Sequence, residues 1–167
     1  MSRYRYPYNR YNRFDVLRVN PATVAAVLFL SRHVLTFLVL GIALSRMPAS
    51  GRGAFSGLFE PVYMLADIPA LLVFLAMLAR HPKTGPTLRL VWRCGPLLLL
   101  GSTLIYLGLV IRQVGIDPAQ YGWLLGAMIA GAVAAPAYVL LSPYARALFG
   151  EFPDPRLAED GPDKSRS

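Results

Sequence analysis

The chain has 167 residues, of which 55% are hydrophobic and only 16% are charged, and its net charge is +8. This composition is more apolar and less charged than that of an ordinary soluble domain, and the length suits one domain. The single cysteine, Cys94, excludes an intramolecular disulfide.

The first predicted element is a basic arm, residues 1–20, in which arginine and tyrosine alternate in the stretch SRYRYPYNRYNR. Arginine and aromatic side chains can stack on nucleic-acid bases. Here the segment is short and no RNA-binding fold follows it. We therefore expect an unstructured cytoplasmic arm that touches lipid and helps to set topology, and no nucleic-acid partner.

Four apolar runs follow, at residues 21–45, 61–78, 94–111 and 121–142. Each is long enough, as a helix, to cross roughly 30 Å of hydrocarbon. The runs are continuous rather than alternating, which favours helices over strands. The predicted fold is therefore all-α: an integral membrane four-helix bundle that occupies residues 21–142.

A short amphipathic helix is predicted after the last run, at residues 143–152. On the cytoplasmic membrane surface it would place apolar side chains in lipid and its arginine among anionic headgroups. The residues of this predicted interfacial anchor are Tyr144, Arg146, Leu148, Phe149 and Phe152. Trp92, just before the third run, is likewise expected in the headgroup layer. Residues 153–167 are predicted to form a disordered cytoplasmic tail.

Basic residues predict the orientation of the chain. Thirteen lysines and arginines fall in the N-terminal segment, the loop between the second and third runs, and the C-terminal segment, against three in the other two loops and their borders. Such residues are retained on the cytoplasmic side. We therefore expect both termini in the cytoplasm.

Three stretches resemble one family: FDVLRVNP at Phe14 to Pro21, LFLSRH at Leu28 to His33, and YARALFGEFP at Tyr144 to Pro153. They are similar to the bacterial inner-membrane proteins grouped as domain of unknown function 2919, the YfeZ-type proteins. The resemblance implies a multi-pass protein of the bacterial inner membrane. It implies no activity and no catalytic residues.

Ionisable side chains inside apolar helices are costly, so they are candidates for function. Arg32 and Asp67 differ in predicted depth by only about 6 Å, although their side chains lean in opposite directions along antiparallel helices. The predicted polar cluster consists of Arg32, His33, Thr36, Asp67, Ser102 and Tyr106. Two interpretations stay open: hydrogen bonds that hold helices together, or a substrate or proton pathway.

Small residues recur every fourth position along the last run. They are Gly122, Gly126, Ala130 and Ala134. A ridge of this kind permits close approach of another helix. We expect it to pack within the bundle, in preference to packing against another protein.

No enzyme motif is present, so we expect no catalytic residue, no cofactor and no metal. The only second histidine, His81, lies far from His33 in the predicted topology. The leading hypothesis is a non-catalytic accessory or assembly partner of a membrane or envelope complex. The alternative is a small oligomeric transporter or channel-like protein with a polar pathway near Arg32 and Asp67. The expected partners are the lipid bilayer and either a membrane protein or further copies of the chain.

Overall fold

The computed structural model describes residues 6–12, 16–46, 61–116 and 122–153. Within these ranges every regular element is a helix, and the only β-type pairing is one isolated bridge between Tyr11 and Leu17. The predicted all-α class is confirmed. Residues 1–5, 13–15, 47–60, 117–121 and 154–167 lie outside the described residues, so the predicted disordered tail is not described beyond Pro153.

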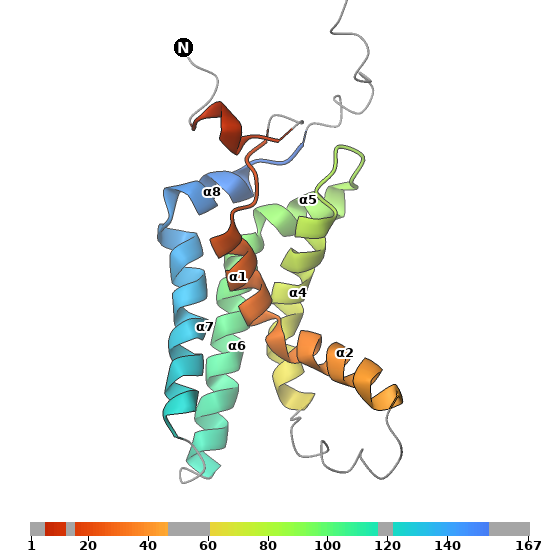
Figure 1. Cartoon of the computed structure of the whole chain (residues 1–167). Helices are drawn as coiled ribbons and strands as arrows, with labels where there is room; N and C mark the ends of the chain where they lie inside the picture. Colours follow the sequence, from red (N-terminus) through yellow and green to blue (C-terminus); the bar gives the residue numbers. More distant parts are fainter. Residues whose placement is uncertain (1–5, 13–15, 47–60, 117–121, 154–167) are drawn as a thin grey trace, which may run out of the picture.

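Three long helices stand side by side and a shorter one packs against part of them (Figure 1). The elements in chain order are η1 (Tyr8–Arg10), α1 (Pro21–Leu30), α2 (Arg32–Ser45), η3 (Pro61–Tyr63), α4 (Met64–Leu78), α5 (Pro86–Arg93), α6 (Gly95–Ile116), α7 (Trp123–Leu141) and α8 (Pro143–Gly150). Helix α4 packs on α6, α6 packs on α7, and α1 contacts both α4 and α7. Helices α5 and α8 and the described part of the N-terminal arm close one end of the bundle, which we call the capped end (Figure 1).

The helices differ in their capacity to span a membrane. Helices α6 and α7 are long and apolar enough by themselves, whereas α4 has 15 residues and is a shorter apolar helix. Helices α1 and α2 reach the required length only together, and they are bent by 73° with respect to each other. The described residues thus hold two candidate spans, or three if the bent pair is one, which is compatible with a membrane protein.

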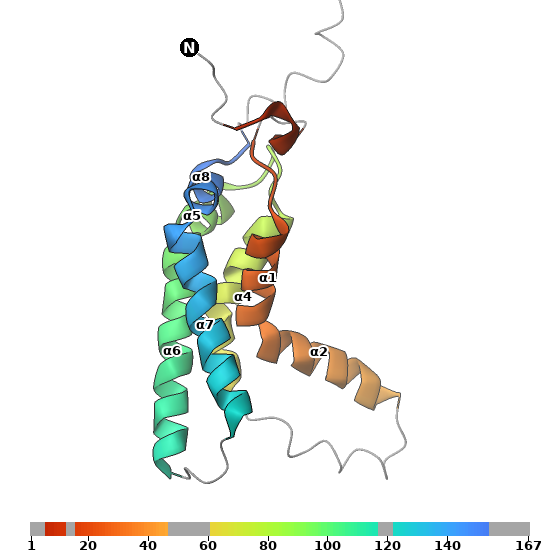
Figure 2. The same ribbon diagram turned by 60° about the vertical axis from the view of Figure 1, so that its left-hand side comes forward.

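The prediction of one continuous helix over residues 21–45 is wrong. Helix α1 begins as expected, with Pro21 in its first turn and the Asn20 side chain accepting the N–H of Thr23 at 2.8 Å. It ends at Leu30, and α2 then leaves the bundle sideways (Figure 2). Beyond its first turn most of α2 is exposed, including Phe37 and Val39.

Small side chains form the contact faces of the bundle. On α4 these are Ala66, Ala70, Val73 and Ala76, all at most 1% exposed. Their spacing of three or four residues places them on one face of the helix. Alanines allow the helix axes to approach closely, so dispersion contacts between backbones replace those of large side chains.

The expectation that the small-residue ridge packs within the bundle is also wrong. Helix α7 uses a different face, on which Ala132, Ala135 and Val139 are buried. The ridge residues are all exposed: Gly122, Gly126, Ala130 and Ala134. Nothing in the described chain lies within 4 Å of a Cβ built on Gly122 or Gly126. The ridge therefore faces away from the chain's own helices.

The capped end differs from the prediction of lipid-facing rings and a loose arm. Helix α8 forms inside the predicted range, but Leu148 and Phe149 are at most 2% exposed. Phe149 packs on Trp92, with ring centroids 4.5 Å apart, and the indole N–H of Trp92 donates to the Leu148 carbonyl. Because Phe149 and Trp92 are packed against each other inside the protein, they cannot act as lipid anchors. Arg146 remains exposed, and Phe152 is half-buried beneath the Arg89 guanidinium.

Candidate functional site

The break between α1 and α2 is occupied by the side chain of Asp67, which comes from the first turn of α4. A helix N-terminus leaves backbone N–H groups without partners. Here the N–H of Val34, in the first turn of α2, donates to Asp67 Oδ2 at 2.9 Å. Asp67 therefore caps α2 from another helix, and its negative charge is favoured by the positive ends of two helix dipoles. Serine commonly caps helices, but the Ser31 hydroxyl is buried and has no hydrogen-bond partner among the described residues.

The second oxygen of the same carboxylate binds His33. The two side chains meet at 2.9 Å between His33 Nδ1 and Asp67 Oδ1. Asp67 is only 2% exposed, whereas the His33 side chain is 25% exposed. Two donors thus satisfy a buried carboxylate that would otherwise be strongly destabilising.

Two tyrosine rings pack against the histidine of this pair. The His33 ring stacks on Tyr63 at 5.5 Å and lies 5.8 Å from Tyr106, and the two tyrosine rings are 5.8 Å apart. Tyr63 belongs to η3 and Tyr106 to α6, so the cluster joins three separate elements of the bundle. Sequence reasoning did not include Tyr63, because nothing in its own segment marks it as close to His33.

Arg32 does not bind Asp67. Its guanidinium donates to the Phe29 carbonyl at 2.9 Å and lies over the rings of Phe29 and Tyr106, at 4.4 and 4.6 Å from their centroids. Arginine attraction to aromatic faces accounts for this position. Another guanidinium nitrogen, Nη2, is buried and has no hydrogen-bond partner in the part of the chain that the structure describes. The carboxylate therefore pairs with His33 rather than with its arginine neighbour.

The remaining members of the predicted polar cluster lie at different places. Ser102 is buried, and its hydroxyl donates to the Ala66 carbonyl at 2.7 Å, one residue before Asp67. The adjacent Thr103 donates to the Ala132 carbonyl at 2.9 Å. These hydroxyls tie α6 to α4 and to α7. Thr36 is exposed on α2 and is not among the groups in contact.

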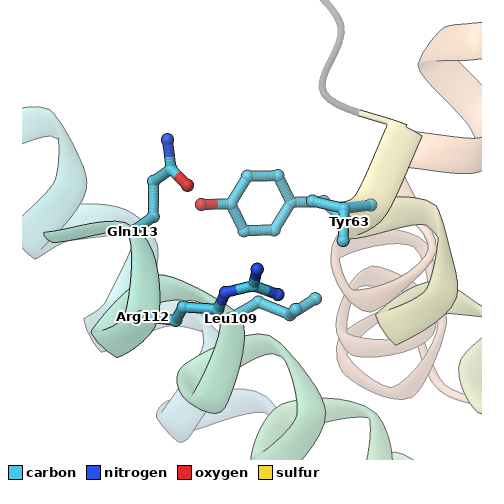
Figure 3. A pocket seen from close by; sticks show the side chains of 5 residues that line it. Tyr63, Leu109, Arg112 and Gln113 are labelled. Carbon is cyan, nitrogen blue, oxygen red and sulfur yellow. The ribbon is translucent and has the colours of Figure 1, made fainter. Parts of the chain in front are cut away.

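A small cavity lies beside Tyr63, and His33 is not among the residues that line it. It has a volume of about 220 Å³ and is lined by Val62, Tyr63, Leu109, Arg112 and Gln113. In Figure 3 the Gln113 side chain extends from α6 toward the hydroxyl end of Tyr63, and the Arg112 side chain extends below the ring. Arg32 and Asp67 do not line this cavity. No group of three or more histidine, cysteine, aspartate or glutamate side chains within the described ranges could hold a metal ion.

A second polar arrangement, at the capped end, is centred on Arg80. Its Nη1 donates to the Leu17 carbonyl at 2.7 Å and its Nη2 to the Glu151 carbonyl at 2.9 Å, while its guanidinium lies 4.9 Å from the Trp92 ring centroid. The Glu151 carboxylate in turn accepts the N–H of Leu17 at 2.9 Å. Burial lowers the pKa of Arg80 to about 10, against a smaller opposing effect of Glu151. The guanidinium thus stays charged at neutral pH.

Tyr144 connects α8 to the N-terminal arm. Its hydroxyl donates to the Arg18 carbonyl at 2.7 Å, its ring meets the Tyr6 ring edge-on at 5.2 Å, and the Arg10 guanidinium lies over it. Burial raises the pKa of this phenol, and Arg10 opposes the effect. The described part of the arm is therefore folded against the protein, contrary to the prediction of an unstructured segment.

The comparison with protein families agrees with the resemblance found in the sequence. The model of the family described as "Protein of unknown function (DUF2919)" matches residues 6–151, which is most of the chain. The chain belongs to this family, as its sequence predicts. No curated protein and no solved structure matches the chain.

Proposed function

We propose that this member of a family of unknown function is a four-crossing protein of the bacterial inner membrane, with both termini in the cytoplasm. In this proposal α1 and α2 form one bent crossing and α4, α6 and α7 form the others. The apolar length of α6 and α7 supports insertion, and the distribution of basic residues supports the orientation. The described termini lie at one end of the bundle (Figure 1), as an even number of crossings requires.

Its role in this proposal is that of a non-catalytic accessory or assembly partner of a membrane complex. The observation that carries this role is the outward ridge on α7. In a lipid environment small residues favour close packing with another helix, because the backbones can approach and bury polar groups. The described residues of the chain leave the ridge uncovered. We assign it to a transmembrane helix of a different membrane protein.

The test is site-specific photocrosslinking in membranes. A photoreactive side chain at Ala130, on the ridge, is compared with one at Leu104, which is 61% exposed on α6. We expect one adduct of defined mass from position 130 and none from position 104. An adduct of twice the chain's own mass would overturn the hetero-partner assignment, and the absence of any adduct would overturn the role.

A ridge variant provides the matching functional readout. Gly126→Leu meets no atom of the described chain within 4 Å of the new Cβ, so the fold should tolerate it. We expect the variant to reach the membrane at the normal level and to lose the adduct at position 130. Retention of the adduct would show that the ridge does not form the contact.

A transporter is the second candidate, and the broken helix is what favours it. Discontinuous membrane helices place substrate and ion sites at their breaks, and Asp67 and His33 occupy this break. The test is to label His33→Cys, in a Cys94→Ala background, with a thiol reagent that cannot cross membranes. Labelling would indicate a water path to the break and favour transport. Protection of the thiol from both sides would reject it.

A further inference from the structure

Among the described residues, the side chains that line the cavity beside Tyr63 include an arginine and no acid. Its polar lining consists of the Arg112 guanidinium, the Gln113 amide and the Tyr63 hydroxyl, and its apolar lining of Val62 and Leu109. Within the described residues, Arg112 makes no ion pair and no side-chain hydrogen bond. A guanidinium with no carboxylate partner beside an amide and a phenol suits an oxyanion, above all a phosphate group.

The position of Arg112 along α6 matches the depth of lipid phosphates. Arg112 lies 17 residues after Gly95, the first residue of α6 at the capped end. At 1.5 Å per residue the two are about 26 Å apart along the helix. If the capped end lies at one border of a hydrocarbon core roughly 30 Å thick, Arg112 lies close to the opposite border.

The surroundings of the cavity suit lipid tails rather than a soluble anion. Ile105 lies one turn before Leu109 on α6, and Leu65 follows Val62 by three residues; they are 39% and 56% exposed. Both continue the apolar surface from the cavity toward the middle of the bundle. The volume of about 220 Å³ is below the range of roughly 300–1,000 Å³ that holds whole small molecules. It fits one polar headgroup whose tails lie outside.

We propose that this cavity binds the phosphate-bearing headgroup of a phospholipid in the leaflet opposite the capped end. Arg112 binds the phosphate, Gln113 and Tyr63 flank it, and the acyl chains lie on the surface that includes Leu109 and Ile105. The inference rests on the proposed membrane insertion. Because the Tyr63 ring also stacks on His33, a bound headgroup would hold η3 against the break between α1 and α2.

The test is native mass spectrometry of the full chain in mild detergent, titrated with phosphatidylglycerol. We expect one tightly bound lipid, and a weakening of about tenfold or more in Arg112→Gln, because a charge-assisted contact is lost. Arg46→Gln is the matched control, since Arg46 is an exposed arginine directly after α2 and does not line the cavity. This control should bind as the natural chain does.

A second variant tests the cavity without a change of charge. Val62→Phe fills the space while Arg112 remains, and we expect it to weaken the lipid equally, with an unchanged unfolding temperature. Diacylglycerol, which has the tails but no phosphate, should not compete. The inference is overturned if Arg112→Gln and Arg46→Gln behave alike, if diacylglycerol competes, or if inorganic phosphate alone occupies the site. Failure of the proposed membrane location would appear separately, as absence of the chain from the membrane fraction.

Discussion

Replacement of Arg80 by methionine should release the N-terminal arm from the capped end. The guanidinium is the only group in the described chain that donates to the carbonyls of both Leu17 and Glu151. Methionine preserves most of the side-chain length and can still pack on Trp92, so the change removes charge and donors rather than volume. The two carbonyls would then lack their donors.

The expected loss follows from the contacts. Each charge-assisted hydrogen bond contributes about 1.5–3 kcal/mol. The lowered pKa of Arg80 shows that burial opposes its charge, and methionine avoids that cost. We therefore expect a net loss of about 2–3 kcal/mol, less than the sum of both bonds. For a chain of this size that corresponds to a fall of about 4–12 °C in Tm.

Cys94 offers a native reporter, because the chain's single thiol lies between α5 and α6 at the capped end. Thermal unfolding in detergent is measured as the temperature at which Cys94 becomes reactive to a thiol label. Lys83→Met is the control, because Lys83 is exposed near the same end and its substitution removes an equal charge. The reasoning is refuted if Arg80→Met and Lys83→Met unfold at the same temperature.

Three further predictions concern other contacts. Gly95→Ala should destabilise the folded protein by about 1–3 kcal/mol, because the new Cβ would lie 2.4 Å from the Phe149 ring. Gly108→Ala, whose Cβ would meet open space, should not destabilise it. Equal Tm values for the two variants would contradict this. A double-mutant cycle of unfolding free energies should give coupling of about 0.5–3 kcal/mol for His33 with Asp67, and additivity for Arg32 with Asp67; the reverse pattern would show that the partner of Asp67 is misassigned. The phenolate absorbance of Tyr144, identified by its loss in Tyr144→Phe, should titrate at higher pH in the folded chain than in the unfolded chain, because the pKa of Tyr144 is raised on folding. The contribution of Tyr144 to stability is therefore present below the usual pKa of 10.0 and is lost as pH rises through the pKa of the folded chain. Coincident titrations of the folded and unfolded chains would contradict this.

The helical elements could be predicted because continuous apolar runs are a local property of the sequence. The ranges expected for the second and fourth runs differ from η3 with α4 and from α7 by at most two residues at either end. The break after Leu30 could not be predicted in this way, since LFLSRHVL contains no proline or glycine. It depends on Asp67, more than thirty residues away, which accepts the Val34 N–H. A single sequence does not show such a long-range cap.

The prediction for the capped end failed for a different reason. The periodic rings of α8 do mark one apolar face, but amphipathicity does not say whether lipid or protein covers that face. Trp92, Phe149 and Arg80 cover one another. One sequence signal for a structural role of Arg80 was available. Arg80 lies two residues after Leu78, the end of an apolar helix, and the negative end of the helix dipole favours a cation there.

The three stretches that carry the family resemblance occupy two places in the structure, and one physical theme joins them. FDVLRVNP and YARALFGEFP meet at the capped end, where the N–H of Leu17 binds the Glu151 carboxylate and the Tyr144 hydroxyl binds the Arg18 carbonyl. LFLSRH forms the break that Asp67 caps. In each place a side chain distant in sequence forms a hydrogen bond with a backbone N–H or carbonyl group at a helix end or in a segment outside the helices, where no helical hydrogen bond is available. The segments thus specify where helices stop and turn, which apolar composition alone leaves undetermined.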